Sequence, residues 1–247
     1  MNTAATHALG YPYFPYYPVV LDILRSRRAD SVLDAPCNRG WLGDMARPAT
    51  GRDVEVDGIG PAALPESANG YRRLTVHDLE SPLPVQAAYD AVVCSEAIHQ
   101  ATDPGLLVQA LRQALRPGGT LVLTAPNAAD VRARLRALKR GFQAGSSAQS
   151  NPPGSTASAM PLPWGFVQLH RLLADQGFAD ITLHNVVEVG RGPWLDRLLA
   201  WPARRDCQAR LKRAQDEPSR HFWRQAGSDS SLHGRWLVVS ARRPGGQ

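Results

Sequence analysis

Short apolar stretches alternate with segments of helical periodicity along most of the chain. The sequence YDAVVCS (89–95) is a short, mostly apolar run, as expected for a parallel strand that is covered on both faces. Residues 104–116 instead repeat apolar side chains every three or four positions, which predicts an amphipathic helix. Such alternation predicts an α/β fold with a largely parallel sheet. Strands are predicted at 31–35, 53–57, 71–76, 89–95, 120–126, 179–189 and 235–242.

Local signals indicate where several of these elements begin and end. Asp103 and Pro104 form an N-cap and N1 pair at the start of one helix. The sequence Pro117-Gly118-Gly119 is typical of a turn and predicts the end of that helix. Gly58 and Gly60 are expected to close the second strand. Further helices are predicted at 19–24, 39–46, 131–142 and 164–178, and a basic helical insertion at 190–232.

The predicted organisation is a single α/β domain over residues 1–247 with a doubly wound, mostly parallel seven-stranded sheet. Its expected parts are an N-terminal arm (1–30), a ligand-binding core (31–127) and a second half (128–247) that carries the insertion. Residues 144–161 are rich in Ser, Pro and Gly and predict a loop. The aromatic stretch YPYFPYYP (11–18) predicts a lid over the cofactor or acceptor, an arm packed on the domain, or both at once.

Composition and charge are those of a globular protein with an uneven charge distribution. The chain has 247 residues, 43% of them hydrophobic, and a formal net charge of +6. Acidic side chains outnumber basic ones in residues 1–130, whereas basic side chains predominate in residues 191–247. This asymmetry is explained either by an anionic partner or by solvated helix faces. No apolar run approaches the ~20 residues of a membrane span.

Cysteine usage indicates a reducing environment. Cys37, Cys94 and Cys207 are scattered and have neither the pairing of a disulfide framework nor the spacing of metal ligands. No metal site is therefore predicted. The expected location is the cytoplasm.

Carboxylates follow the strands on one predicted edge of the sheet. Asp34 ends the first strand, and Asp57 follows it at close to the ~20-residue separation of a ribose-binding acid. The turn at 77–79 and the pair Ser95-Glu96 would lie on the same edge, because ligands collect where parallel strands end. A glycine-rich loop with a lysine, which would hold phosphates, is missing from the sequence. The pattern favours a ligand with a ribose and a positive charge.

Five segments in order resemble the motifs of class I S-adenosylmethionine (SAM)-dependent methyltransferases, in particular the small-molecule group often labelled type 11 or type 12. They are VLDAPCNRG, VEVDGIG, LTVHDLESPLP, YDAVVCSEAIHQATDP and LRPGGTLVLTAPN. The resemblance is good from about residue 30 to residue 127 and moderate to residue 242. It implies the Rossmann-like methyltransferase fold and SAM as cofactor. The TAPN ending resembles members that act on sugars, lipids or quinone precursors.

The resemblance also implies a role for individual side chains. Asp57 would bind the ribose, Asp78 would accept from the adenine amino group, and Leu79 would pack on the adenine ring. The turn from Ala35 to Gly40 would approach the methionine part of SAM. The cofactor-binding residues implied are Asp34, Ala35, Pro36, Asn38, Gly40, Asp57, Gly58, Asp78, Leu79, Ser95 and Glu96.

The first motif departs from the family where glycine is usual. Pro36 and Asn38 occupy these positions, and glycine serves there because the backbone needs positive φ or must approach a ligand closely. Asparagine tolerates left-handed backbone better than most residues, so Asn38 is a plausible substitute. Arg39 is an unexpected neighbour for a sulfonium ion. A left-handed backbone at Asn38 would preserve the loop.

The expected reaction is transfer of a methyl group to an oxygen, in preference to nitrogen or carbon, of a small-molecule, sugar-linked or lipid-linked acceptor. His99 is the candidate base, because the pKa of imidazole suits neutral pH. Relatives have Glu-His in this segment, whereas this chain has His99-Gln100, so the histidine is shifted by one residue. The alternative is that His99 is an ordinary residue at a helix start. His170 is a second, weaker candidate.

Four further points concern two other segments, a nucleic-acid partner and the alternative to an enzyme. The Asn-Pro-Pro-Gly sequence at 151–154 is interpreted as linker, because it follows the fifth strand and lacks the aromatic residue of amino-methylating enzymes. Residues 193–213 combine Trp and Leu with arginines, which fits either a helix at a membrane surface or a helix that caps the acceptor pocket. Nucleic acid is disfavoured as a partner because no recognised binding motif is present. The alternative to an enzyme is a methyltransferase-like protein that binds or scaffolds without catalysis.

Overall fold

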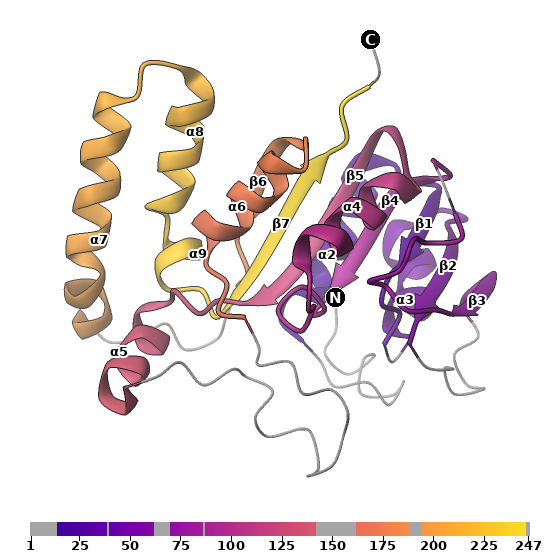
Figure 1. Ribbon diagram of the computed structural model, residues 1–247, viewed down its shortest axis with the longest axis horizontal. Coiled ribbons are helices and arrows are strands. Elements are labelled where there is room, and N and C mark those ends of the chain that lie inside the picture. Colours follow the sequence, from indigo (N-terminus) through magenta and orange to yellow (C-terminus); the bar gives the residue numbers. More distant parts are fainter. Residues whose placement is uncertain are drawn as a thin grey trace.

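The computed structural model describes residues 14–38, 40–61, 70–85, 87–141, 162–187 and 194–245. Its seven strands form one sheet in the order β3-β2-β1-β4-β5-β7-β6, and β7 runs antiparallel to both of its neighbours (Figure 1). The predicted doubly wound, mostly parallel seven-stranded sheet is therefore confirmed. The strands are β1 (Ser31–Asp34), β2 (Glu55–Gly60), β3 (Arg73–Val76), β4 (Tyr89–Ser95), β5 (Leu115–Pro126), β6 (Ala179–His184) and β7 (Trp236–Arg242).

Two strands differ from their predicted bounds. β2 continues to Gly60 instead of ending at Asp57, since Gly58, Ile59 and Gly60 keep pairing with β3. β5 begins at Leu115, directly after the preceding helix, so the Pro-Gly-Gly sequence lies inside the strand instead of forming a separate turn. Gly118 supplies the left-handed backbone needed there, with φ of 82°.

Helices cover both faces of the sheet. Buried residues of α2 and α3 pack with Val32, Val93 and Val122 on one face. The opposite face, which includes Leu33 and Val92, packs against α4 and α6 and touches α8. The helices are α2 (Tyr17–Arg27), α3 (Trp41–Thr50), α4 (Pro104–Ala114), α5 (Val131–Arg140), α6 (Phe166–Asp175), α7 (Trp194–Arg213), α8 (Glu217–Ala226) and α9 (Asp229–Leu232).

The sequence signals at α4 are confirmed, and the insertion is helical as predicted. The side chain of Asp103 caps α4 by accepting a hydrogen bond from the Leu106 amide at 3.0 Å, and Pro104 is the first helical residue. Helices α7 and α8 form an antiparallel hairpin beside the sheet (Figure 1). Residues 62–69, where a helix was expected after Pro61, and the predicted loop at 144–161 lie outside the described residues.

The described part of the aromatic N-terminal stretch packs on the domain. Tyr17 stacks on Trp41 with ring centroids 3.9 Å apart, and Phe14 meets Trp236 edge-on at 5.6 Å. Tyr16 is buried between these contacts. Residues 14–18 thus form the packed arm of the two alternatives, and residues 11–13 lie outside the described residues.

Asn127, the last residue of the TAPN sequence, joins the end of β5 to the start of β7. Its buried side-chain amide donates to the carbonyl oxygens of Ser231 and Gly234, both at 2.8 Å. Its side-chain oxygen accepts from the Ala129 amide at 3.0 Å. The side chain therefore satisfies backbone groups that would otherwise be buried without partners, which explains this asparagine structurally. In the described part of the chain, no helix is long and apolar enough to cross a membrane.

Candidate functional site

The turn between β1 and α3 is held by the strands on either side of it. The Ala35 amide donates to the Val93 oxygen on β4, and the Cys37 amide donates to the Ile59 oxygen on β2, both at 2.9 Å. Asn38 adds a third tie, since its side-chain amide donates to the Ser95 oxygen at 3.0 Å. The turn is thereby fixed at the switch point between β1 and β4.

Asn38 has the backbone conformation on which the interpretation of this loop depends. Its φ is +37°, and Gly40 follows at +82°. The expectation of a left-handed asparagine in place of glycine is confirmed. Pro36 has no backbone N–H group. The amides of its neighbours, Ala35 and Cys37, already donate to strand carbonyls, so the turn keeps these hydrogen bonds despite the proline.

A cavity of about 200 Å³ opens next to this turn, at the carboxyl ends of β1 to β4. Five of the predicted cofactor-binding residues line it: Pro36, Asn38, Asp78, Leu79 and Glu96. The other lining residues are Pro61, Glu80, Ala97, Gln100, Ala101 and Leu107.

Sequence reasoning missed these other lining residues, although two of them carried a signal. Gln100 occupies the position of the family's histidine and lies four residues after Glu96, which is one helical turn. Glu80 follows Asp78 in the same predicted turn, and its carboxylate accepts from the Thr102 amide at 2.6 Å. This bond joins the loop after β3 to the segment before α4.

Glu96 is the most unusual carboxylate of the lining. Its φ is +56°, and its amide bonds to both the carbonyl and the hydroxyl oxygen of Thr124, at 3.1 and 3.2 Å. The side chain is partly buried, and its Oε1 has no hydrogen-bond partner among the described residues. Burial raises the pKa of Glu96 to about 7. A carboxyl group in this state can both give up and accept a proton near neutral pH.

Asp34 lies behind the turn and does not line the cavity. It is fully buried, and its Oδ2 accepts from the Tyr71 hydroxyl at 2.6 Å. Burial raises the pKa of Asp34 to about 8, although the Tyr71 hydrogen bond acts in the opposite direction. The remaining predicted residues outside the lining, Ala35, Gly40, Gly58 and Ser95, belong to the strand ends and the turn that carry it.

Asp57 does not occupy the position that its spacing predicts. It pairs with Leu33 in the sheet, whereas Gly58 is the residue in register with Asp34. Its carboxylate is buried, accepts from the Tyr89 hydroxyl at 2.8 Å, and forms an ion pair with Arg72 at 2.6 Å. Burial raises its pKa, but the hydrogen bonds from Arg72 and Tyr89 outweigh this effect and the pKa is lowered. The geometry therefore counts against Asp57 as the ribose-binding acid.

His99 is not among the residues that line the cavity, although its Nε2 lies 3.3 Å from the side-chain nitrogen of Gln100, which does line it. His99 is buried, its Nδ1 has no partner among the described residues, and burial lowers its pKa to about 4. The one-residue shift seen in the sequence thus places Gln100, instead of His99, on the cavity wall. The second candidate, His170, packs against Phe166 and Phe222. Neither histidine is among the residues that line the described cavity.

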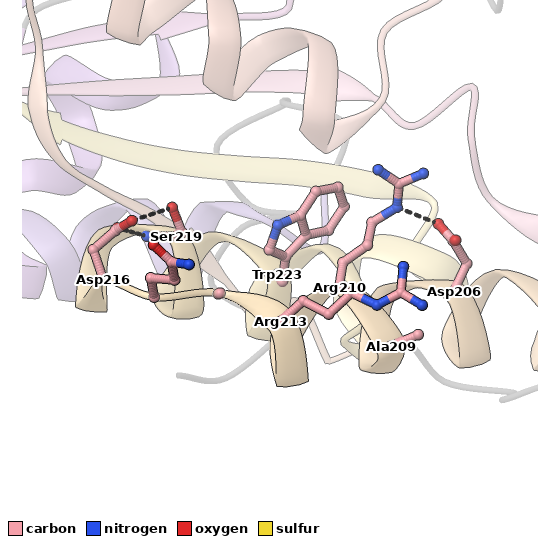
Figure 2. Close-up of a pocket in the computed structure, with 9 residues that line it drawn as sticks. Asp206, Ala209, Arg210, Arg213, Asp216, Ser219 and Trp223 are labelled. Atoms are coloured by element: carbon pink, nitrogen blue, oxygen red, sulfur yellow. Dashed lines mark hydrogen bonds and ion pairs between the residues drawn. The ribbon is translucent and has the colours of Figure 1, made fainter.

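A second cavity of about 480 Å³ lies between α7 and α8 (Figure 2). Its charged groups are largely engaged with one another: Arg210 bonds to Asp206 at 2.8 Å and stacks near Trp223. Asp216 caps α8 by accepting from the Ser219 amide at 2.7 Å. These contacts stabilise the hairpin, so this cavity is not the candidate site.

The residues at the carboxyl edge fit a SAM-type ligand in chemistry. Asp78, Glu80 and Glu96 offer carboxylates to cationic and hydroxyl groups, Leu79 and Leu107 offer apolar surface, and no described lining residue is basic. The described cavity is smaller than the ~300 Å³ at which drug-sized ligand sites begin, so it encloses part of such a ligand. Groups of three or more potential metal ligands do not occur among the described residues.

The fold and this site define a class of protein, and the comparisons identify it. Strand order, the antiparallel β7 and an acidic cavity at the switch point define a Rossmann-like fold for a nucleoside ligand. A family model described as "Methyltransferase domain" matches residues 14–227. The chain therefore belongs to the methyltransferase domain family, the class I SAM-dependent methyltransferases. The expected family and its cofactor, SAM, are confirmed at this level.

Curated relatives are similar over the core. The ubiquinone biosynthesis O-methyltransferase of Xanthomonas campestris pv. campestris (strain B100) is 33% identical over 127 residues, which are 47% of this chain and 52% of that protein. The protein of the same name from Aeromonas salmonicida (strain A449) is 30% identical over 128 residues, 47% of this chain and 53% of its own length. The chain thus spans about half the length of the curated relatives it matches.

Solved structures share the fold at low identity. The Burkholderia thailandensis 1,6-didemethyltoxoflavin-N1-methyltransferase, solved with its substrate and S-adenosylhomocysteine, has a TM-score of 0.53 at 16% identity, over 92% of this chain and 76% of that chain. The [4+2]-cyclase SpnF has a TM-score of 0.51 at 17% identity, over 93% and 81%. The fold alone therefore does not fix the reaction.

A substitution pair tests the left-handed turn. Asn38→Gly should leave the free energy of unfolding within ~1 kcal/mol, because glycine adopts positive φ freely while one hydrogen bond is lost. Asn38→Val should lower it by ~2 kcal/mol and weaken S-adenosylhomocysteine binding, because a β-branched residue is strained there. Urea denaturation and calorimetric titration measure both effects. Equal stability of the two variants would contradict a left-handed Asn38.

A second pair of substitutions distinguishes the structural role of Asp57 from the ligand-binding role expected of Asp78. Asp57→Asn should cost ~1–2 kcal/mol of unfolding free energy, because it weakens the Arg72 and Tyr89 contacts, and should leave S-adenosylhomocysteine affinity nearly unchanged. Asp78→Asn should do the reverse and lower that affinity about tenfold, the effect of one charge-assisted hydrogen bond. If Asp57→Asn folded and lost affinity as strongly as Asp78→Asn, Asp57 would be a ligand-binding residue after all.

Proposed function

We propose that the protein transfers the methyl group of SAM to a hydroxyl oxygen of a small-molecule, sugar-linked or lipid-linked acceptor. Glu96 is the observation that carries this proposal, since it places a partly buried carboxyl group in the cavity wall, and its buried Oε1 has no hydrogen-bond partner among the described residues. The curated relatives, which are named O-methyltransferases, support oxygen over nitrogen or carbon. The acceptor half is expected in residues 128–247, and the cytoplasm remains the expected location.

The cavity wall supplies the groups that would hold the cofactor. Asp78 and Glu80 would accept from its amino and hydroxyl groups, while Leu79 and Leu107 would pack on its apolar parts. When bound, SAM supplies a methyl group that already carries a good leaving group. The protein's own contribution is alignment of the acceptor and removal of its proton.

Glu96 is the group proposed to take that proton, in place of His99. The Glu96 carboxylate would accept the hydroxyl proton as the acceptor oxygen takes the methyl group from its sulfonium leaving group, which would leave the carboxyl group neutral and the acceptor methylated. A base is most effective when its pKa lies near the working pH, and burial brings Glu96 to about 7. A phenolic hydroxyl has a pKa of about 10 and is therefore a better match than an alkyl hydroxyl. The favoured acceptor is a phenol or another acidic hydroxyl.

Two observations favour the alternative of a binding or scaffold protein without catalysis. The described cavity is small, and Asp57, the expected ribose acid, is engaged by Arg72 and Tyr89. A methyltransferase-like domain that no longer binds SAM would also be expected to have a small cavity and an engaged carboxylate at this position. The lining, however, gathers three carboxyl groups, Asp78, Glu80 and Glu96, and no described lining residue is basic, which fits a cationic ligand.

Titration and methyl transfer together test the proposed function. We expect the full chain to bind SAM and S-adenosylhomocysteine in calorimetry, and to transfer labelled methyl from SAM to a catechol such as 3,4-dihydroxybenzoate in preference to the matching aniline. Absence of heat at millimolar ligand would contradict the enzyme and favour the scaffold. Binding with label on the aniline nitrogen would contradict oxygen as the acceptor atom.

The pH dependence tests Glu96 itself. The kcat/KM of the wild-type protein should rise with pH and level off above about 7, because Glu96 must be ionised to accept a proton. Glu96→Gln should lower kcat by about 10²-fold and remove this rise. Glu80→Gln, which removes another lining carboxylate, should keep the wild-type pH profile and serves as the matched control.

Stability provides an independent readout of the same residue. The pKa of Glu96 is raised in the folded state, so the folded protein holds this proton more tightly than the unfolded chain does. Its contribution to stability is present at pH 4 and is lost as the pH rises to about 7. Glu96→Gln should therefore gain stability relative to the wild-type protein at pH 8 but not at pH 4. An equal difference at both pH values would show that Glu96 has an ordinary pKa.

A further inference from the structure

A line of apolar side chains on α7 faces solvent. Trp194, Leu198 and Trp201 are spaced by four and three residues and therefore share one face of the helix. They are 75%, 59% and 55% exposed, respectively. A helix that caps an acceptor pocket would bury such side chains, and no α7 residue is among those that line the cavity at the carboxyl edge. The structure thus counts against the capping alternative for this face.

Basic side chains continue the same face of α7. Arg205 and Lys212 follow Trp201 at helical spacing, and the Arg205 guanidinium lies 5.2 Å from the Trp201 ring centroid. Both belong to a shallow hollow that also includes Trp201. The face therefore begins apolar and aromatic and becomes cationic towards the end of the helix.

Helix α5 is strongly basic and exposed, and it lies beside the first turns of α7 (Figure 1). Arg132 at its start pairs with Asp196 of α7 at 2.8 Å. Leu138 is 81% exposed, and the two residues after it, Lys139 and Arg140, form no ion pair with any described residue. Its only buried residue is Val131. Most of α5 thus remains available for a partner.

The two helices lie at the edge of the sheet that carries the cavity. α5 follows β5 and begins beyond the carboxyl end of that strand, where the strands β1 to β4 also end. The Arg132–Asp196 ion pair fixes the start of α7 at the same edge. A surface that contacted α5 and the first half of α7 would therefore meet the protein on the side from which the acceptor enters.

We propose that this face, formed by α5 and by Trp194, Leu198 and Trp201 of α7, docks on an anionic lipid surface. Tryptophan prefers the boundary between lipid headgroups and acyl chains, and leucine side chains gain from burial below it. Lysine and arginine side chains at the depth of the headgroups contact lipid phosphates. This electrostatic attraction adds to the free energy of binding gained by burying the apolar side chains. Charge complementarity together with exposed aliphatic side chains favours a bilayer over nucleic acid, whose backbone offers nothing to Leu138 or Leu198.

The experiment uses the full chain and vesicles of defined composition. We expect the protein to sediment with vesicles that contain phosphatidylglycerol and not with vesicles of phosphatidylcholine alone, and we expect added salt to weaken binding. Trp194→Ala combined with Trp201→Ala, and separately Lys139→Gln combined with Arg140→Gln, should each lower the partition coefficient about tenfold. Circular dichroism should show that both variants stay folded, because all four side chains are exposed.

A charge-matched control is available at the opposite edge. Arg27 and Arg28 end α2 just before β1 begins, so they lie at the amino edge of the sheet and are also exposed. Arg27→Gln with Arg28→Gln removes the same charge and should leave vesicle binding unchanged. The proposal would be overturned if the wild-type protein did not bind anionic vesicles, or if the Arg27/Arg28 control lost as much vesicle binding as the Lys139/Arg140 variant. It would also be overturned if the protein bound an oligonucleotide but not the vesicles. A dimer in solution that the tryptophan variants dissociate would also overturn it. Because vesicle binding is measured without SAM, its outcome is independent of the proposed function.

Discussion

The candidate site depends on how the turn after β1 is tied to its two neighbouring strands. The amides of Ala35 and Cys37 and the side chain of Asn38 bond to carbonyl oxygens of β4, β2 and the end of β4, respectively. A family loop built with glycine relies on its freedom to take positive φ. Here the asparagine takes the left-handed conformation and also bonds across to Ser95. The Asn38 side chain therefore fixes the turn in one conformation, where glycine would leave it free to move. Its hydrogen bond also holds the end of β1 next to the end of β4, beside the cavity.

Buried carboxyl groups concentrate around this turn, and their environments differ. Asp34 and Glu96 both have raised pKa values because burial disfavours their ionised forms. Asp57 is also buried, but Arg72 and Tyr89 keep it ionised. A cation placed in the cavity would favour the ionised form of Glu96 as Arg72 does for Asp57. Binding of a positively charged cofactor and ionisation of the proposed base would then support each other.

The sequence predicted the fold well, whereas the lining of the described cavity matches the predicted site only in part. Apolar runs and turn residues placed all seven strands, and the pattern is clearest where strands are buried on both faces, as in β1, β4 and β5. Asp57 lies inside β2, three residues before the strand ends at Gly60, and His99 is buried next to Gln100, which lines the cavity. In a strand or a tight turn, a shift of one residue points a side chain to the opposite side. Spacing along the chain gives the separation between a residue and a motif, but the length and register of β2 decide how far Asp57 lies from the carboxyl edge of the sheet.

The exposed face of α5 and α7 extends this reasoning from the site to its surroundings. From the sequence alone, the tryptophan residues of α7 are compatible with a helix that caps a pocket and with a helix at an interface. Their exposure in the structure distinguishes these two interpretations. Because α5 is tied to α7 by Arg132 and Asp196, the apolar line and the basic helix form one surface. An enzyme held there on a bilayer would present its cavity edge to the membrane. An acceptor with a hydrophobic chain could then reach the site without leaving the lipid phase, so the cavity would have to enclose only the reacting hydroxyl and its ring.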